Sequence, residues 1–440
     1  MKQRIGIGII GFGTVGCGVV KILIDQAELI RRRVGIPLEI VGIADQDITS
    51  DRGIALDRGI LTTDVKRLID NPQTDIVVEL IGGLEPAKQF IVAALAKGKP
   101  LVTANKALLA VHGEEIYATA QQYGVDIGFE ASVGGGMPII RTLREGLAGE
   151  KVHTIYGIIN GTANYILTKM NEEEVPFQEV VAEAQRAGFA EADPSTDIEG
   201  LDSAHKLAIL INLAFGTPVN LGDVYTEGVT SITSLDLEAA REFGYTIKLL
   251  GIAKWSCGDA RLPQGQIEAR VHPTMIPNHS PLAQVNGVFN AIHLVGESVG
   301  DIMVYGRGAG SLPTGSAVVG DLIDIARNLA TKACVRVPHC SFQPDAREML
   351  RLKPMAELCC AYYLRFTVQD TPGILSQLAG ILGDHDISIA SVLQRGRERG
   401  GKVPVVMITH EATEHNIQAA IQKIEGNLSE RTMIIRIESQ

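Results

Sequence analysis

The sequence of 440 residues predicts an α/β protein with three successive folded segments. Residues 1–130 alternate short β-rich runs with helical patterns, which is typical of βαβ units and a parallel sheet. Residues 362–440 follow the order strand, helix, strand, strand, helix, strand, which is the ferredoxin-like arrangement. Residues 131–340 mix glycine-rich turns, strands and a long apolar helix, so we expect an α+β domain for substrate and dimerisation there. Residues 341–361 are then a linker.

The composition is that of an ordinary soluble globular protein, with 45% apolar and 21% charged residues. The formal net charge of −11 favours neither nucleic acid nor an anionic membrane as a partner. No apolar run reaches the roughly 20 residues of a membrane helix, although the first residues resemble a signal peptide. The cysteines form no C-x-x-C pair, so we expect reduced thiols in a cytoplasmic protein; they are Cys17, Cys257, Cys334, Cys340, Cys359 and Cys360.

A glycine loop follows the first predicted strand and opens the first helix. Its residues are Gly11, Phe12, Gly13, Thr14, Val15 and Gly16. In this context the first glycine permits the tight turn, the second admits a pyrophosphate, and the third allows close helix–strand packing. The loop therefore predicts a Rossmann-type domain that binds NAD or NADP.

Two residues bear on the choice between these cofactors. Asp45 closes the second predicted strand, where a carboxylate accepts the ribose hydroxyls of NAD and repels a 2′-phosphate. Arg52, a few residues further on, could still reach such a phosphate, so the choice stays open.

A second polar group follows a later strand of the same domain. Thr103, Asn105 and Lys106 lie at the carboxyl end of the run KPLVT, where open α/β sheets bind ligands. Position alone favours a solvated lysine over a functional one.

The run EADPSTDIEGLDSAHKL gathers five carboxylates ahead of one lysine. Projected on a helix, Asp202 and Lys206 share one stripe, and the residues that follow are apolar nearly all round. Charges at such a place are costly unless they are paired. A structural ion pair would account for Asp202 and Lys206 but not for Glu191, Asp193 or Asp197. A cleft for a ligand with an ammonium group accounts for these acids better.

Three glycine-rich turns remain ambiguous from chemistry alone. Residues 129–140 place Glu130 before three glycines, and a carboxylate with several carbonyls suits a hard cation, although a structural turn is the favoured reading. Residues 157–167 are an ordinary turn on their own, and residues 305–323 are either such a turn or an additional backbone cradle for cofactor or substrate.

Along nearly its whole length the chain resembles the homoserine dehydrogenase family, in the single-function form with a C-terminal ACT domain. The matching blocks are GFGTVG, TANK, EASVGGGMPI, NGTANYIL, EADPSTDIEGLDSAHKL, YGRGAG with PTGSAVVGDL, and DTPGIL. The resemblance implies NAD(P)-dependent interconversion of L-homoserine and L-aspartate 4-semialdehyde, on the route to threonine, methionine and isoleucine. Many relatives have arginine where this chain has Asp45 and Gln46, so strict NADP preference is not implied.

The resemblance also implies roles for individual residues. Lys206 corresponds to the acid/base, and Lys106 to its partner beside nicotinamide and substrate. Glu191 and Asp202 correspond to substrate ligands with Asp197 in support. Other matching positions are Gly188 and Gly306 near the cofactor, with Thr103 in the same role, and Glu130, Val133, Gly135 and Met137 as a site for sodium or potassium.

The C-terminal unit has two readings. It binds an effector, most plausibly threonine near Asp370, Pro372 and Gly373, or it only joins subunits into a dimer or tetramer. Two other functions compete with the family assignment. An aspartate-semialdehyde dehydrogenase would need a thiolate nucleophile, and no cysteine lies in a suitable motif. An inert amino-acid sensor is disfavoured by the complete glycine loop and by Lys106 and Lys206.

Overall fold

The computed structural model describes residues 3–256, 265–394, 396 and 401–438, so Cys257 lies outside the described part. The chain divides into two compact units, each discontinuous in sequence. The first unit comprises residues 1–161, 202–224 and 289–350, and the second comprises 162–201, 225–288 and 351–440.

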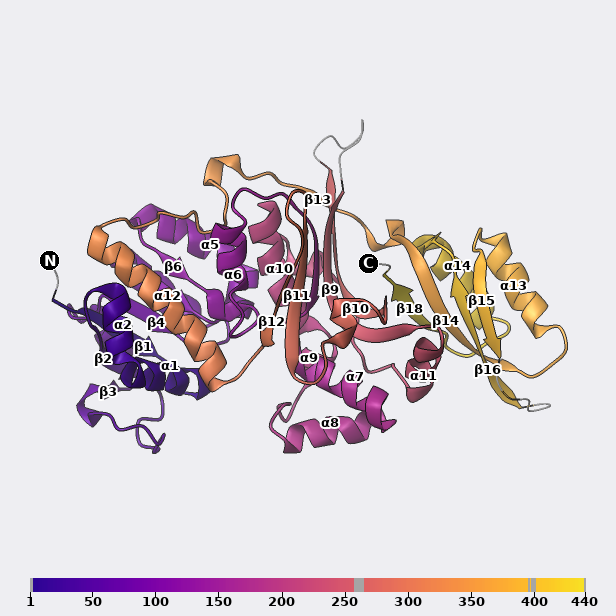
Figure 1. The fold of residues 1–440 in the computed structure, drawn as a ribbon, viewed down its shortest axis with the longest axis horizontal. Coiled ribbons are helices and arrows are strands. Elements are labelled where there is room, and N and C mark those ends of the chain that lie inside the picture. The colour runs from indigo at the N-terminus through magenta and orange to yellow at the C-terminus, as the bar shows by residue number, and fades with distance from the viewer. Residues whose placement is uncertain (1–2, 257–264, 395, 397–400, 439–440) are drawn as a thin grey trace. The chain divides into compact units, whose positions relative to one another are not determined.

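The first unit contains a six-stranded parallel sheet in the order β3-β2-β1-β4-β5-β6, as the sequence predicts (Figure 1). The strands are β1 (Ile5–Ile10), β2 (Leu38–Ala44), β3 (Leu61–Thr62), β4 (Ile76–Glu79), β5 (Leu101–Thr103) and β6 (Ile127–Gly128). Strand β1 is buried along its whole length, which explains its unbroken apolar run. The helices that follow these strands are α1 (Thr14–Asp25), α2 (Ala27–Val34), α3 (Val65–Asp70), α4 (Ala87–Ala96) and α5 (Lys106–Tyr123).

A helix from far along the chain completes this layer. Helix α12 (Ser311–Thr331) packs its apolar face into the same core as β1 and α1 (Figure 1). Helices α1 and α12 approach each other closely. A Cβ on Gly18 would collide with the carbonyl of Ser311, and one on Gly315 would lie 2.9 Å from the nitrogen of Val19, so glycine is needed at both positions. The nucleotide-binding unit therefore needs residues beyond the predicted range 1–130, while the predicted domain boundaries themselves stay predictions.

The rest of the first unit is an antiparallel ladder with helices. Strand β11 (Phe289–Gly296) pairs with β7 (Val152–Ile158) and β12 (Gly300–Arg307). Helix α10 (Leu201–Phe215) is mostly apolar and buried from Leu207 onward, as the projection predicts, with Asn212 and Ala214 partly exposed. Shorter elements are η1 (Arg58–Ile60), η2 (Glu130–Ser132), α6 (Ile139–Arg141), the π-helical turn η3 (Thr142–Gly146) and η4 (Leu221–Asp223).

The second unit is organised by one mixed sheet in the order β9-β10-β18-β14-β16-β15. Its strands are β9 (Tyr245–Ser256), β10 (Gln266–Pro277), β14 (Cys359–Gln369), β15 (Ile389–Gln394), β16 (Lys402–Thr409) and β18 (Met433–Ile437), with short β8 (Tyr225–Thr226), β13 (Arg351–Leu352) and β17 (Ala412–Thr413) beside them. Its helices are α7 (Gly161–Glu173), α8 (Phe177–Arg186), α9 (Ser195–Ile198), α11 (Ser234–Glu242), α13 (Ile374–Asp384) and α14 (Glu414–Glu425), with η5 (Pro281–Gln284) and η7 (Met355–Glu357) as single turns. The turn η6 (Pro344–Ala346) belongs to the first unit.

The predicted ferredoxin-like order of the C-terminal residues is confirmed as β14-α13-β15-β16-α14-β18. Helices α13 and α14 cover a core that contains Tyr362, Leu378 and Ile421. Strand β14 begins at Cys359, three residues before the predicted strand, and β18 pairs in parallel with β10. The C-terminal βαββαβ arrangement is thus hydrogen-bonded into a larger sheet of the same unit.

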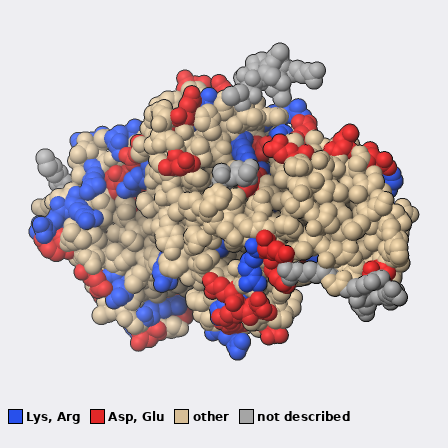
Figure 2. All heavy atoms as spheres, turned by 45° about the vertical axis from the view of Figure 1, so that its right-hand side comes forward, with Lys and Arg blue, Asp and Glu red and all other residues tan. Residues whose placement is uncertain are grey.

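The surface and the helices agree with the composition. On the face drawn in Figure 2, both positive and negative side chains are present, and the negative ones gather most densely at the lower centre. Within the described residues, none of the helices has both the length and the apolar character needed to cross a membrane. The cysteines that the structure describes are free thiols.

Candidate active site

Two lysines converge on one buried carboxylate in the first unit. The Nζ of Lys206 lies 2.6 Å from Oδ2 of Asp202, and the Nζ of Lys106 lies 2.6 Å from Oδ1 of the same residue. Lys206 also donates to the carbonyl of Ile159 at 2.7 Å, and the side chain of Asn160 donates to Oδ2 of Asp202 at 2.9 Å. The structure thus brings together Lys106, Asp202 and Lys206, although Lys106 is 96 residues from Asp202 in the sequence.

Burial sets the electrostatics of this cluster. Asp202 is 2% exposed and Lys206 7% exposed, whereas Lys106 reaches solvent. Burial alone would raise the pKa of Asp202, but the charges of Lys206 and Lys106 outweigh it and hold that pKa well below its usual range. Asp202 is therefore ionised at neutral pH, and it holds two ammonium groups near one another without neutralising both.

Lys106 is positioned by a chain of polar contacts at the end of β5. Thr103 is the last residue of β5, and its hydroxyl accepts from the backbone N–H of Asn105 at 3.0 Å. Asn105 caps helix α5 by accepting from the N–H of Leu108 at 3.1 Å, so Lys106 is the first residue of that helix. This is the strand end at which the sequence predicts a ligand.

Glu79 is a residue that the sequence interpretation missed. It ends β4, is fully buried, and accepts from the hydroxyl of Thr103 at 2.7 Å and from the N–H of Ile81 at 2.8 Å. Burial raises its pKa, and these donors oppose the rise. The run IVVE, an apolar strand that ends in an acid, could have indicated it, because a carboxylate that is buried at a strand end needs hydrogen-bond donors around it.

The segment at residues 157–167 also has more function than the turn assigned to it. Ile159 and Asn160 supply the two further contacts of the lysine–aspartate cluster. In the second unit, Asn164 donates to the carbonyl of Val285 at 3.0 Å and accepts from Lys248, which is 1% exposed. Burial lowers the pKa of Lys248 to about 8.

The glycine loop has the geometry that a pyrophosphate needs. Gly11 has φ +104°, and a Cβ on Gly16 would collide with the carbonyl of Gly11, so both positions require glycine. A Cβ on Gly13 would meet nothing within 4 Å, which leaves open space at the middle of the loop. Gly13 is the N-cap of α1, whose N-terminus attracts anions. The residues present therefore fit a dinucleotide.

Asp45 and Arg52 lie beside this loop. Oδ2 of Asp45 accepts from the N–H of Phe12 at 2.5 Å and Oδ1 accepts from the N–H of Asp47 at 2.9 Å, so the carboxylate supports the loop. The guanidinium of Arg52 lies 5.9 Å from the ring centre of Phe12 and donates to Asp47 at 3.2 Å. Its Nε is buried without a hydrogen-bond partner among the described residues, so Arg52 has donor capacity to spare.

The glycine run after Glu130 is a tight loop against residues 305–310. Gly134 and Gly135 have positive φ, and a Cβ on Gly135 would lie 2.5 Å from the carbonyl oxygen of Gly308. Across the same contact the N–H of Gly136 donates to the carbonyl of Arg307, and a Cβ on Gly306 would lie 3.0 Å from Met137. The turn at 305–310 therefore braces the predicted cation loop.

The carboxylate of Glu130 is occupied within the protein. It accepts from the N–H groups of Ile140 at 2.7 Å and Arg141 at 2.9 Å, while its own N–H donates to Asp321 at 2.8 Å. Burial, followed by the charge of Asp321, raises the pKa of Glu130 to about 7. The carboxylate fixes the loop, so the backbone carbonyls are the groups left to bind a cation. Among the described residues, no backbone N–H group donates to the carbonyl of Val133 or Gly135.

The remaining predicted ligands belong to the second unit. Glu191 is exposed beyond α8, Asp197 is half-buried in α9, and Gly188 has φ +75° in the turn between them and α8. Their roles stay predictions. Asp370, Pro372 and Gly373 form the turn between β14 and α13 as expected, with Gly373 at φ +91° as the N-cap of α13.

A glycine loop on a parallel sheet, with Lys106 after the end of β5 paired to the buried carboxylate of Asp202 beside Lys206 on α10, is the arrangement of a nicotinamide-dependent oxidoreductase. Models of known families match the chain in three places: "Homoserine dehydrogenase, NAD binding domain" at residues 11–130, "Homoserine dehydrogenase" at 138–323 and "ACT domain" at 362–428. The homoserine dehydrogenase of Pseudomonas aeruginosa is 44% identical over 442 residues, with 99% of each chain covered.

Solved structures agree. A homoserine dehydrogenase from Thiobacillus denitrificans is 45% identical, covers 99% of both chains and has a TM-score of 0.92. A hyperthermophilic archaeal homoserine dehydrogenase in complex with NADPH is 26% identical, covers 73% of this chain and 97% of its own, and has a TM-score of 0.61. The chain belongs to the homoserine dehydrogenase family and carries an ACT domain. The semialdehyde-dehydrogenase and inert-sensor alternatives are not favoured.

Proposed function

We propose that the protein interconverts L-homoserine and L-aspartate 4-semialdehyde, with Lys206 as the acid/base. The cluster of Lys106, Asp202 and Lys206 carries this proposal. When bound, the nicotinamide exchanges a hydride with the carbon that bears the reacting oxygen. Lys206 donates a proton to the developing alkoxide during reduction and accepts it during oxidation. Lys106 is a second cation for that oxygen, which gains negative charge in the transition state.

The acids of the run 191–202 are assigned to the substrate. The substrate brings an ammonium group, for which Glu191 and Asp202 are the proposed ligands, with Asp197 in support. Because Asp202 also holds both lysines, it links the bound amino acid to the acid/base. An ammonium ligand is held in the ground state and the transition state alike, so these acids should determine KM more than kcat.

Cofactor choice is proposed to include NADP. The unused donor of Arg52 beside Phe12 supports a contact with a 2′-phosphate, and the NADPH complex of the archaeal relative is consistent with it. Asp45 supports NAD as well, because its carboxylate is tied to the loop and can still accept a ribose hydroxyl. Thr103, Gly188 and Gly306 are the further proposed cofactor neighbours.

A monovalent cation, sodium or potassium, is proposed to bind Glu130 together with the carbonyls of Val133, Gly135 and Met137. The positive φ of Gly135 and the occupied carboxylate of Glu130 support backbone oxygens as ligands. The cation would stiffen this loop. It takes no part in the proton or hydride step.

The ACT domain is proposed to bind an amino-acid effector, threonine, near Asp370, Pro372 and Gly373. The open glycine turn ahead of α13 supports this, because backbone N–H groups there can hold a carboxylate. We further propose a cytoplasmic homodimer or homotetramer. Equal inhibition by threonine of the unsubstituted enzyme and of Asp370→Ala would argue against this effector site. Size-exclusion chromatography with light scattering would give the oligomeric state.

The primary test is the absorbance of reduced nicotinamide when the protein meets L-homoserine with NADP or NAD. Reduction of either cofactor is expected, without any requirement for phosphate and without inhibition by thiol-blocking reagents. Cofactor reduction with L-aspartate 4-semialdehyde in place of homoserine, dependent on phosphate and a free thiol, would instead indicate a semialdehyde dehydrogenase. A protein that was inert with both cofactors would refute the proposal.

A further inference from the structure

The acidic segment, residues 191–200, contains Asp197. It contacts a short stretch of the second unit, residues 225–229, which we call the strap. The N–H of Val229 donates to the carbonyl of Ile198, the last residue of α9, at 2.8 Å. A Cβ on Gly228 would collide with that same carbonyl, so strap and segment are in direct backbone contact. Gly200 has φ +88°, and a Cβ on it would contact the side chain of Thr226 and the carbonyl oxygen of Glu227. The position of the strap therefore sets the position of residues 195–200.

The strap is itself fastened along β10. Tyr225 and Thr226 form β8, which pairs in parallel with Arg270 and Val271 of β10. The N–H of Glu227 continues the pairing by donating to the carbonyl of Val271 at 2.8 Å. Beyond Glu227 the strap turns away toward Ile198, so the side chain of Glu227 sits at the point where the pairing with β10 ends.

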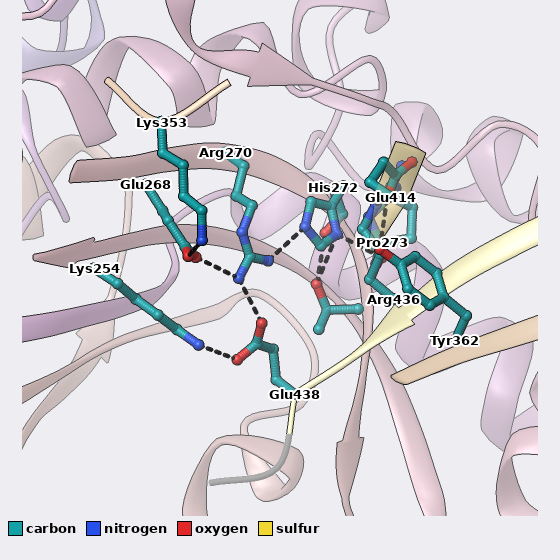
Figure 3. A network of polar contacts seen from close by, with 11 residues as sticks. Lys254, Glu268, Arg270, His272, Pro273, Lys353, Tyr362, Glu414, Arg436 and Glu438 are labelled. Carbon is teal, nitrogen blue, oxygen red and sulfur yellow. Dashed lines mark hydrogen bonds and ion pairs between the residues drawn. The ribbon is translucent and has the colours of Figure 1, made fainter. Parts of the chain in front are cut away.

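The carboxylate of Glu227 is clamped from the ACT domain's last strand. Oε2 of Glu227 accepts from Nη1 of Arg436 at 2.8 Å and from the hydroxyl of Tyr225 at 2.9 Å. Arg436 is 2% exposed, and it also makes two hydrogen bonds to Glu414, at 2.6 and 2.9 Å. Figure 3 shows Arg436 between Glu414 and Tyr362, on the β18 side of β10.

The burial of the partners makes this clamp rigid. The guanidinium of Arg436 lies 5.0 Å from the ring centre of Tyr225 and has its place fixed by Glu414, which accepts also from Tyr362. Charge-assisted hydrogen bonds of this kind are shorter and stronger than neutral ones. Glu227 is the partly exposed partner, with 30% of its side chain accessible. Buried Arg436 therefore holds the carboxylate of Glu227 in place, and Glu227 in turn holds the strap.

We propose that Glu227 is a positioning residue that holds the acidic segment for substrate binding, with Arg436 of β18 as its anchor. The proposal rests on the proposed function of Glu191 and Asp197 as substrate ligands. It gives the C-terminal strand a role in substrate binding that is independent of any effector. Loosening the strap should displace the segment and weaken capture of the amino acid, while the glycine loop and Lys206 of the other unit keep their own contacts.

The test compares two matched carboxylate deletions in the full chain. Glu227→Ala removes one acid from Arg436, which keeps Glu414. Glu268→Ala is the control, because it removes one acid from buried Arg270, which keeps Glu438 at 2.6 Å. Both variants leave the buried arginine paired, so both are expected to fold, and thermal denaturation checks this.

The expected result is a KM for homoserine raised about tenfold in Glu227→Ala, with kcat and the KM for NADP unchanged. Glu227→Gln, which keeps an acceptor for Arg436, should recover most of the loss, and Glu268→Ala should match the unsubstituted enzyme. Equal KM in Glu227→Ala and the unsubstituted enzyme, or equal rises in both alanine variants, would overturn the inference.

Asp197→Ala and Glu191→Ala separate this inference from the function beneath it. A raised KM in these variants together with an unchanged KM in Glu227→Ala would refute the positioning role alone. An unchanged KM in Asp197→Ala and Glu191→Ala would refute the proposed substrate role of the segment, and the inference would fall with it.

Discussion

Replacement of Lys206 by methionine tests the acid/base assignment directly. Methionine keeps an unbranched apolar stem on a helix that is buried on nearly every side, and it removes the ammonium group. That group has two acceptors within the protein, Asp202 at 2.6 Å and the carbonyl of Ile159 at 2.7 Å. The substitution therefore removes the proposed proton donor and leaves both acceptors in place.

The substitution should affect both catalysis and folding. Loss of a general acid typically lowers kcat by about 10²–10⁴-fold. Folding loses two charge-assisted hydrogen bonds, to Asp202 and to the carbonyl of Ile159, at about 1.5–3 kcal/mol each. Asp202 keeps Lys106 at 2.6 Å and Asn160 at 2.9 Å, so its charge is not left unpaired.

The assay is steady-state turnover of homoserine, with cofactor affinity measured separately by nicotinamide fluorescence. Cofactor affinity should be unchanged, because the glycine loop is untouched. Lys21→Met is the matched control, since Lys21 also pairs with an acid four residues away on a helix, Asp25 at 2.9 Å, but is exposed. A turnover number in Lys206→Met close to that of Lys21→Met would refute the acid/base role.

Three further predictions follow from other contacts. Arg52→Ala should raise the KM for NADP about tenfold or more, by the loss of a charged hydrogen bond to the 2′-phosphate, and leave the KM for NAD unchanged; equal effects on both cofactors would contradict the assignment. Glu79→Gln places an amide against the hydroxyl of Thr103 and should lower the free energy of unfolding by about 1–3 kcal/mol and also lower kcat, measured by urea unfolding and turnover; loss of stability at full kcat would make Glu79 purely structural. Burial lowers the pKa of Lys248 from 10.5 to about 8, so between these pH values the unfolded chain binds the proton more tightly, and the enzyme should gain about 3 kcal/mol of stability relative to Lys248→Met as pH rises. A difference between the two proteins that stayed constant from pH 8 to 10.5 would show that Lys248 does not titrate there.

Local patterns in the sequence predicted the elements that local physics determines. The glycine loop follows from what Gly11 and Gly16 must permit, and the stripe of Asp202 and Lys206 follows from helical periodicity alone. The cost of burying charge then predicted that this pair would be either a structural ion pair or part of a cleft for an ammonium group. The family resemblance added the roles, since helical geometry does not distinguish an acid/base from an ion pair.

Contacts between distant segments could not be predicted in this way. Lys106 on position alone was a solvated lysine, and only the fold brings it to Asp202. Glu227 and Arg436 lie 209 residues apart, and nothing in either local sequence indicates the other. Such pairs depend on strand order, which periodicity does not encode.

The return of helix α12 to the nucleotide-binding sheet has a consequence for synthesis. Residues 1–130 leave the ribosome first, but the apolar surface that Val318, Val319 and Leu322 cover stays open until residue 331 has been made. At about 5–20 residues per second, the remaining 200 or so residues take roughly 10–40 s. During that interval the nascent sheet exposes apolar surface of the kind that chaperones recognise. An N-terminal fragment ending near residue 130 should therefore aggregate unless α12 is supplied as a separate peptide.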